Sequence, residues 1–320
     1  MSVQITSSQF QHKFKCSRCG STSYENNLEY QEQGKCSSCI NLTETEAKKK
    51  KKVNVMVFRR GTRNFGFFSN CSVLLFDLYN KYNKFKYLPK NIDFKKTFNN
   101  YKTDEQILNK KNTYPLFFKI NKNIKIEKRS NYIIKEDYNL NKEYKPKDIY
   151  IFKDFVSRYF DVSNEIKAIQ KDFIKKYIID LEKTICIWYR GTDKYKESHS
   201  ASLNSYIIKL KEIIKTNSSM RVWIQTDQHM ALEHFKKKLK NIKHFNIKES
   251  ITTQGNEGIH LGYKGNGFEL GKIHLAITHL ISQCHTIITH SGNGSFWAYL
   301  YRGNLDNFYQ DKLFKYDPWK

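Results

Sequence analysis

The stretch "ICIWYRGTDK", Ile185 to Lys194, joins an apolar segment directly to a cluster of polar and charged residues. Apolar residues over Thr184–Tyr189 predict a buried strand, and similar segments occur at Arg221–Thr226 and His285–Thr289. Each is followed by a segment with apolar residues at helical spacing, at 203–215, 228–240 and 294–303. Strands that alternate with helices of this length predict a doubly wound parallel sheet.

The rest of the chain adds further elements to this α/β pattern. A helix is predicted over 163–180, because Ser163 can cap its first turn. Another helix over 268–282 leads into the last strand. Nearer the N-terminus we expect a strand at 53–58, a glycine-bearing loop at 59–70, a helix at 71–82 and a short strand at 114–120.

Length and composition restrict the class of protein. A chain of 320 residues can hold two core-bearing domains, and its 4 prolines argue against a disordered chain. The formal charge of +25 favours an acidic partner such as nucleic acid, an anionic membrane or a phosphorylated small molecule. Solvated lysines explain the same charge without any partner. The sequence has no apolar segment long enough to span a bilayer and no apolar signal core, so we expect a soluble, cytoplasmic protein with no transmembrane segment.

The cysteines predict a zinc ribbon at the N-terminus. Four of the 7 cysteines form two CxxC pairs, Cys16 with Cys19 and Cys36 with Cys39. Two such pairs can place four thiolates around one tetrahedral ion, and Zn²⁺ suits an all-sulfur shell. A structural zinc ion would stabilise a segment that is too small to fold on its own core. The three other cysteines lie singly in apolar segments and are expected in the core.

A polar segment marks the first domain boundary. "TETEAKKKKK", Thr43 to Lys52, has no apolar period and is interpreted as a connector, although a lysine run can also contact phosphates. We therefore expect a zinc ribbon over 1–46, an N-terminal α/β domain over 53–160 and a C-terminal α/β domain over 161–320.

The ends of the predicted strands carry the candidate binding residues. In an open parallel sheet, ligands bind outside the carboxyl ends of the strands. Arg190 can grip a phosphate with two parallel hydrogen bonds, and Asp193 and Lys194 can hold a ribose, a base or each other. Thr226 and Asp227 end the next strand. Asp227 either faces the ligand or caps the following helix.

The turn "SGNGS", Ser291 to Ser295, leaves a strand and opens a helix. Backbone N–H groups at a helix start form an anion site, to which Ser295 can add its hydroxyl. A tight turn with a serine cap is the alternative interpretation. The glycine spacing matches neither a dinucleotide-binding fingerprint nor a P-loop, which excludes NAD-dependent and ATPase functions of those types.

Three segments together resemble the nucleotide-sugar motifs of GT-B glycosyltransferases in the fucosyltransferase superfamily, which includes the α1,6- and protein O-fucosyltransferases. They are "IWYRGTDK", "VWIQTDQHMALEHFKK" and "SQCHTIITHSGNGSFWAYLYRG". The resemblance implies a GT-B-like fold with two Rossmann-like halves, each containing a doubly wound parallel sheet. The N-terminal half would receive a glycan or protein acceptor, and the C-terminal half would bind the nucleotide sugar, most simply GDP-fucose.

The same resemblance implies roles for individual residues. Arg190 would contact the donor diphosphate, and Thr226 with Asp227 would lie at the nucleotide. "NFGFFSN" is similar to a loop where the acceptor approaches, which implicates Asn70. The serine-rich turn would contact phosphate through Ser291, Asn293, Gly294 and Ser295.

The implied reaction is a direct displacement at the anomeric carbon without a catalytic metal. A carboxylate would remove the acceptor proton, and Glu197 is the nearest carboxylate after the arginine motif. A nucleic-acid enzyme of nuclease or transposase type is the main alternative, with Asp193, Asp227 and Glu269 as metal-binding carboxylates. A zinc-ribbon adaptor with an inactive transferase domain is a third hypothesis.

Overall fold

The computed structural model describes residues 12–15, 22–25, 55–57, 65–85, 88–127, 143–192, 202–255, 258–259 and 263–311. The chain divides into two compact units, Met1–Val55 and Met56–Lys320. In the first unit, β1 (His12–Lys15) pairs antiparallel with β2 (Thr22–Glu25). The predicted zinc ligands Cys16, Cys19, Cys36 and Cys39 lie outside the described residues, so the zinc ribbon stays a prediction.

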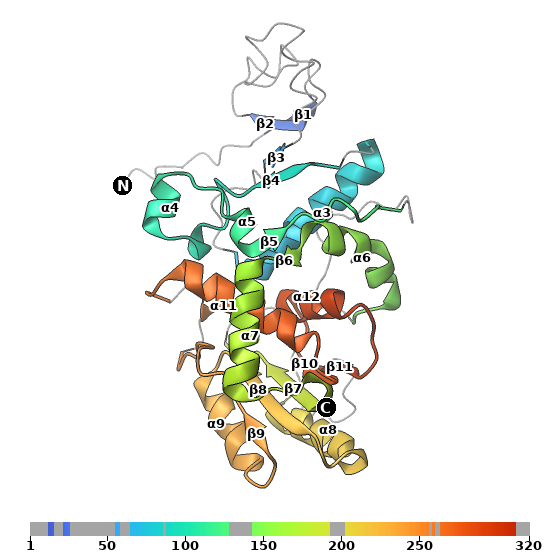
Figure 1. Cartoon of the computed structure of the whole chain (residues 1–320), viewed down its shortest axis with the longest axis vertical. Coiled ribbons are helices and arrows are strands. Elements are labelled where there is room, and N and C mark those ends of the chain that lie inside the picture. The colour runs from blue at the N-terminus through green and yellow to red at the C-terminus, as the bar shows by residue number, and fades with distance from the viewer. Residues whose placement is uncertain are drawn as a thin grey trace, which may run out of the picture. The chain divides into compact units, whose positions relative to one another are not determined.

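The second unit contains a five-stranded sheet in the order β11-β10-β7-β8-β9 (Figure 1). All four strand pairs in it are parallel. The three predicted strands are confirmed as β7 (Thr184–Tyr189), β8 (Arg221–Thr226) and β10 (Thr286–Thr289). Two short edge strands, β9 (His244–Phe245) and β11 (Phe308–Gln310), complete the sheet. The coarse prediction of an α/β fold with a parallel sheet is therefore correct.

The helices that connect these strands begin and end close to the predicted positions. They are α7 (Asn164–Tyr177), α8 (Leu203–Thr216), α9 (His229–Lys238), α11 (Gly267–Ile281) and α12 (Asn293–Arg302), with the 3₁₀ turn η2 (Leu181–Lys183) ahead of β7. Ser163 caps α7 as predicted, because its hydroxyl accepts a hydrogen bond from the Ile166 N–H at 3.3 Å.

Both faces of the sheet are buried, which explains why the central strand β7 has apolar or aromatic residues at every position from Ile185 to Tyr189. Ile185 and Ile187 of β7 join one apolar cluster with residues of α8 and α9, such as Leu210 and Phe235. Their neighbour Cys186 belongs to the cluster on the opposite face, which also contains residues of α7, α11 and α12. Burial of each large apolar side chain contributes about 1.5–3 kcal/mol, so helices on both faces hold the strand ends in place.

Residues 65–162 add mainly helices to this core. The described elements are α3 (Phe67–Phe85), β4 (Asn91–Asp93), η1 (Asn99–Tyr101), α4 (Asp104–Leu108), α5 (Tyr114–Phe117), β5 (Phe118–Lys119), α6 (Pro146–Tyr159) and β6 (Asp161–Val162). β5 pairs antiparallel with β6, and β4 pairs with β3 (Val55–Val57). Within the described residues, this part of the chain has no doubly wound sheet, so the second Rossmann-like half of the GT-B prediction is not seen there.

Two local predictions in this part are corrected. Over Tyr114–Phe117 the chain forms the short helix α5 where a strand was predicted, because Pro115 fits the first turn of a helix and needs no N–H partner there. The helix predicted from residue 71 begins at Phe67. Asn70 therefore lies in the first turn of α3 and not in a loop.

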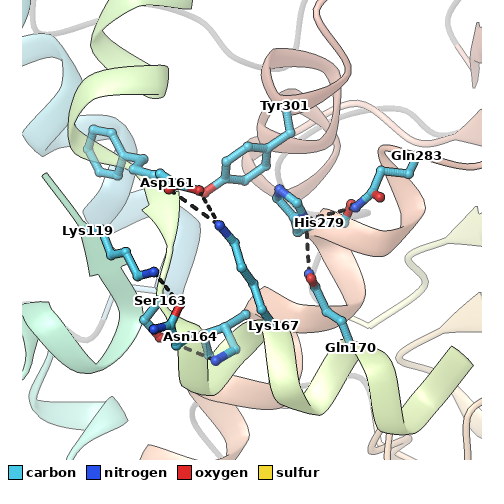
Figure 2. A network of polar contacts seen from close by, with 11 residues as sticks. Lys119, Asp161, Ser163, Asn164, Lys167, Gln170, His279, Gln283 and Tyr301 are labelled. Atoms are coloured by element: carbon cyan, nitrogen blue, oxygen red, sulfur yellow. Dashed lines mark hydrogen bonds and ion pairs between the residues drawn. The ribbon is translucent and has the colours of Figure 1, made fainter. Parts of the chain in front are cut away.

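A polar network joins α7 to α11 (Figure 2). Gln170 Nε2 lies 3.0 Å from His279 Nδ1 and donates to the Ala276 carbonyl oxygen at 3.2 Å, while Gln283 Nε2 lies 2.9 Å from the same ring nitrogen. The edge of Tyr301 packs on the imidazole, with ring centroids 4.9 Å apart. Desolvation by burial lowers the pKa of His279 to about 4. The neutral imidazole thus helps to place α11 against α7.

No helix in the described part of the chain is both long and apolar enough to cross a membrane.

Candidate functional site

A pocket opens at the carboxyl ends of β7, β8 and β10, where ligands bind in open parallel sheets. The empty space among its lining atoms, with the open solvent at its mouth included, is ≈ 860 Å³. Its walls come from the strand ends, the starts of α3 and α12, one side of α11 and the segment after β9. The polar lining residues are Ser69, Arg190, Gln225, Thr226, Asp227, Ser250, His274, His290 and Asn293.

Asp227 holds the turn that follows β7. Its carboxylate accepts hydrogen bonds from the Gly191 N–H at 2.9 Å and the Thr192 hydroxyl at 2.7 Å. Arg190 Nε lies 3.4 Å from the same carboxylate. The helix-cap interpretation of Asp227 is wrong, because Gln228 occupies the N-cap of α9. Asp227 instead orients Arg190 at the mouth of the pocket, where the arginine side chain is 26% exposed.

Gly191 follows β7 and Thr226 ends β8, and both contact Gln228 at the start of α9. A Cβ atom at Gly191 would lie 2.2 Å from Gln228 Oε1 and 2.8 Å from Tyr189 Cε1. The Thr226 hydroxyl is buried and accepts a hydrogen bond from the Gln228 N–H at 3.2 Å. Thr226 therefore contributes to the shape of the turn after β8 as well as to the pocket lining.

The turn after β10 brings the N-terminus of α12 to the same pocket. Gly292 has φ 144° and ψ −176°, a conformation that favours glycine, and no side chain caps the helix. Asn293 and Gly294 line the pocket. N–H groups in the first turn of a helix have no partner within that helix. With no acidic residue in the first turn, this helix start favours an anion.

Ser291 and Ser295 occupy positions that differ from the prediction. The Ser291 hydroxyl is buried, donates to Asp311 Oδ1 at 2.7 Å and accepts from Gln310 Nε2 at 2.7 Å. The Ser295 hydroxyl is also buried and donates to the Gly292 carbonyl oxygen at 3.0 Å. Neither serine lines the pocket. Their hydroxyls hold the turn from within the protein, and the expectation that they contact phosphate is corrected.

The start of α3 forms the facing wall. Gly66, Phe67, Phe68 and Ser69 line the pocket, and the first turn of α3 has no acidic residue. Asn70 is not part of the lining: its side-chain amide donates to the carbonyl oxygens of Phe65 at 3.2 Å and Gly66 at 3.3 Å. Two helix N-termini and one arginine thus border the same pocket.

The α11 side of the pocket is apolar except for His274. Leu270, Ile273 and Ile277 line it, and the His274 ring packs on Phe68 with centroids 5.1 Å apart. His274 was not predicted as a site residue, because a lone histidine on an otherwise apolar helix face gives no specific signal.

Gln225 is a second polar side chain of the pocket that was not predicted. Its Nε2 donates to the Ser250 hydroxyl at 2.6 Å, and its buried Oε1 has no hydrogen-bond partner within the described residues. A glutamine inside the apolar strand "RVWIQT" was the available signal.

Three of the predicted site residues, Asp193, Lys194 and Glu197, lie outside the described residues. In the part of the chain that the structure describes, no group of three or more His, Cys, Asp or Glu residues could hold a metal ion. Glu269 Oε1 pairs with Lys272 Nζ at 2.5 Å, whereas Asp227 is engaged by the β7 turn. These contacts do not support a carboxylate metal site containing both Asp227 and Glu269.

Comparisons with known proteins give only distant structural likenesses. No protein-family model matches the chain, and no curated protein sequence matches it either. Similar solved structures include POFUT1 in complex with GDP, with a TM-score of 0.37 and 11% identity over 53% of this chain and 51% of that chain. NodZ α-1,6-fucosyltransferase co-crystallized with GDP has a TM-score of 0.42 and 13% identity over 77% of this chain and 91% of that chain.

NodZ soaked with GDP-fucose has a TM-score of 0.34 and 15% identity, over 48% of this chain and 46% of that chain. The chain thus spans about half the length of the POFUT1 structure and of this NodZ structure. These likenesses are weak, and the description of the fold rests on the strand order and register of the sheet itself.

Proposed function

We propose that the protein is a glycosyltransferase that transfers a sugar, fucose from GDP-fucose, to a glycan or protein acceptor. One observation carries the proposal: Arg190 and the Asn293–Gly294 start of α12 line the same pocket. The sequence motifs that resemble nucleotide-sugar transferases predict this convergence from segments about a hundred residues apart. Arg190 after β7 and the start of α12 after β10 would then bind one anion together.

The diphosphate would lie between Arg190 and the two helix N-termini. An arginine can donate two parallel hydrogen bonds to phosphate, and helix N-termini contribute N–H donors and a positive end of the helix dipole. The apolar residues of α11 and the segment after β9 would then face the nucleoside. Gln225 offers that part of the pocket a buried acceptor, Oε1.

The reaction would be a single displacement. The acceptor oxygen forms a bond to the anomeric carbon as the bond from that carbon to the diphosphate breaks, and GDP leaves with the electron pair. Arg190 and the helix N-termini stabilise the charge that develops on the leaving group. The acceptor proton passes to a base, and we propose Glu197 or the pocket-lining His274 for this role. The mechanism assigns no step to a metal ion.

Binding and turnover of GDP-fucose test the proposal directly. Wild-type protein should bind GDP in isothermal titration calorimetry and release GDP from GDP-fucose in the presence of EDTA, with water or an added glycan as acceptor. If the protein binds neither GDP nor GDP-fucose, the proposal fails. Binding without any turnover would favour the adaptor with an inactive transferase domain, and binding of DNA in place of GDP would favour the nucleic-acid enzyme.

Arg190→Ala tests the residue that carries the argument. Loss of hydrogen bonds to a charged group costs about 1.5–3 kcal/mol, so the Kd for GDP should rise about 10-fold to 100-fold. Arg190→Lys should recover only part of the affinity, because an ammonium group lacks the planar fork.

Arg221→Ala is the matched control, since Arg221 lies at the amino end of β8, opposite to the strand end that borders the pocket, and bonds to the carbonyl oxygens of Tyr177 and Ile178. The control should retain the wild-type affinity for GDP. Unchanged GDP binding by Arg190→Ala would refute the role of Arg190.

A further inference from the structure

Tyr144 contacts the turn Gly292–Ser295 at the start of α12, although it lies about 150 residues earlier in the chain. It lies just before α6, is 2% exposed, and is not among the residues that line the pocket. Its hydroxyl accepts a hydrogen bond from the Gly292 N–H at 2.9 Å. The same hydroxyl lies 2.8 Å from the Gly292 carbonyl oxygen and 2.6 Å from the Ser295 hydroxyl. One buried oxygen therefore contacts three groups of the turn.

These contacts form a closed set of hydrogen bonds. The Gly292 N–H donates to Tyr144, the Tyr144 hydroxyl can donate to Ser295, and the Ser295 hydroxyl donates to the Gly292 carbonyl oxygen at 3.0 Å. Burial raises the pKa of Tyr144, so its hydroxyl remains a protonated donor at neutral pH. Buried polar groups without partners are costly, which makes each member of the set depend on the others.

The sheet in turn holds Tyr144 in place. Its backbone N–H donates to Gln310 Oε1 of β11 at 2.9 Å, and Gln310 Nε2 donates to the Ser291 hydroxyl at 2.7 Å. Its ring is stacked on Tyr299 of α12, with centroids 5.3 Å apart and an interplanar angle of 15°. These contacts fix Tyr144 against the edge strand β11 and the helix α12, and they do not involve its hydroxyl.

No helix cap fixes the backbone of the turn at Gly292. Gly292 adopts φ 144°, a region where glycine is flexible, and the start of α12 has no side-chain cap. The next two residues, Asn293 and Gly294, are those that line the pocket. Their N–H groups can bind an anion with high affinity only if the peptide before them is held in one orientation. Within the described residues, the hydroxyls of Tyr144 and Ser295 restrain the Gly292 peptide itself. The residues on either side of it are held separately, Ser291 by Asp311 and Gln310, and Asn293 by the Ser72 hydroxyl, which donates to Asn293 Oδ1 at 2.7 Å.

We propose that Tyr144 is a positioning residue for the donor diphosphate, acting through the Gly292–Ser295 turn without touching the ligand. The inference rests on the proposed function, because it assumes that a phosphate group binds at the start of α12. It predicts that affinity for the phosphate part of the ligand depends on a hydroxyl buried behind the pocket, while affinity for the nucleoside part does not.

Tyr144→Phe tests this inference, because it removes one oxygen and keeps the stacked ring. The Kd values for GDP and for inorganic pyrophosphate should each rise about 5-fold to 50-fold, in line with one buried hydrogen-bonding group left without its partner. The Kd for guanosine should stay within about twofold of the wild-type value, which is the scatter expected for a site that loses no contact. The ratio of the GDP and guanosine values is the decisive measurement, since a general loosening of the fold would weaken both.

Tyr299→Phe is the matched control. It also removes a buried tyrosine hydroxyl, the one that donates to the Lys145 carbonyl oxygen at 2.6 Å, and it alters the other ring of the same stacked pair. It leaves the turn untouched and should keep the wild-type ratio. Ser295→Ala removes the other hydroxyl of the set and should shift the ratio in the same direction as Tyr144→Phe. Ser295→Ala decides the question if Tyr144→Phe does not fold.

The outcomes separate this inference from the proposed function. If wild-type protein binds GDP and Tyr144→Phe keeps the wild-type ratio of GDP to guanosine affinity, the positioning role is overturned and the proposed function stands. Equal weakening of GDP and guanosine binding by Tyr144→Phe also overturns it, because the residue would then support the whole fold. If wild-type protein binds neither GDP nor pyrophosphate, the proposed function fails and the inference fails with it.

Discussion

Protonation of His279 should destabilise the protein at mildly acidic pH. Burial lowers the pKa of this side chain from 6.5 to about 4, with Asp161 acting against the shift and Lys167 adding to it. Gln170 and Gln283 both direct an amide nitrogen at Nδ1, at 3.0 and 2.9 Å (Figure 2). A proton on Nδ1 would meet two donors instead of forming a hydrogen bond, so the folded state favours the neutral ring.

The size and direction of the effect follow from proton linkage. Between pH 4 and pH 6.5 the unfolded chain binds the proton of His279 more readily than the folded protein does, so the free energy of unfolding rises with pH in this window. Each unit of pKa difference corresponds to about 1.4 kcal/mol. The contribution is complete above about pH 6.5 and is lost as the pH falls to about 4, with a total of about 3 kcal/mol. That is a large part of the roughly 5–15 kcal/mol that keeps a domain folded.

Urea unfolding of wild-type protein and His279→Gln between pH 4 and pH 7.5 measures this contribution. In the variant, the free energy of unfolding should lose the part of its pH dependence that comes from the proton of His279. This holds whatever the stability of the variant at neutral pH. His285→Gln is the control, because His285 is an exposed histidine at the start of β10. If the free energies of wild type and His279→Gln differ by a constant amount across this range, the reasoning is refuted. His279 lies on α11, the helix that also forms one wall of the pocket, so its protonation should also weaken the packing of that wall.

Two further predictions concern the zinc ribbon and the catalytic base. Cys16→Ser should abolish the binding of one equivalent of zinc, measured by elemental analysis, and should leave the melting of the second unit unchanged; wild-type protein without zinc would disprove the ribbon. If His274 is the base, His274→Gln should lower kcat for GDP-fucose turnover about 100-fold or more and remove the acid limb of the pH profile. The same result with Glu197→Gln, and not with His274→Gln, would assign the base to Glu197.

The sheet illustrates what local sequence patterns can predict. The strands β7, β8 and β10 are four to six residues long, have apolar centres and are followed by helices, so their type and order could be predicted from the sequence. The edge strands β9 and β11 were missed, because two or three residues with polar members carry no periodic signal. The helix α5 was missed for a different reason: its four residues are too few to show a helical period.

The candidate site shows what local sequence patterns cannot predict. Arg190 and Asp227 were named from their places after strands, and Asn293 from the resemblance of its turn to a nucleotide-sugar motif; all three line one pocket. Ser291 and Ser295 came from the same kind of pattern, yet their hydroxyls face the protein interior. The side chain of a serine beside a helix start can point toward the ligand or toward the core. The neighbouring residues in the sequence do not determine which of these two orientations it takes.

The sequence by itself determined the alternation of strands and helices, because a strand buried on both faces needs a short apolar run and a helix that covers a sheet needs an apolar face with helical spacing. The tertiary structure alone decided which polar groups face the pocket and which hold it together. Tyr144 and Gly292 are 148 residues apart, and their contact depends on how α6, α12 and the sheet pack. Contacts over such distances leave no periodic trace in the sequence, since the partner of each residue is set by the fold and not by its neighbours in the chain.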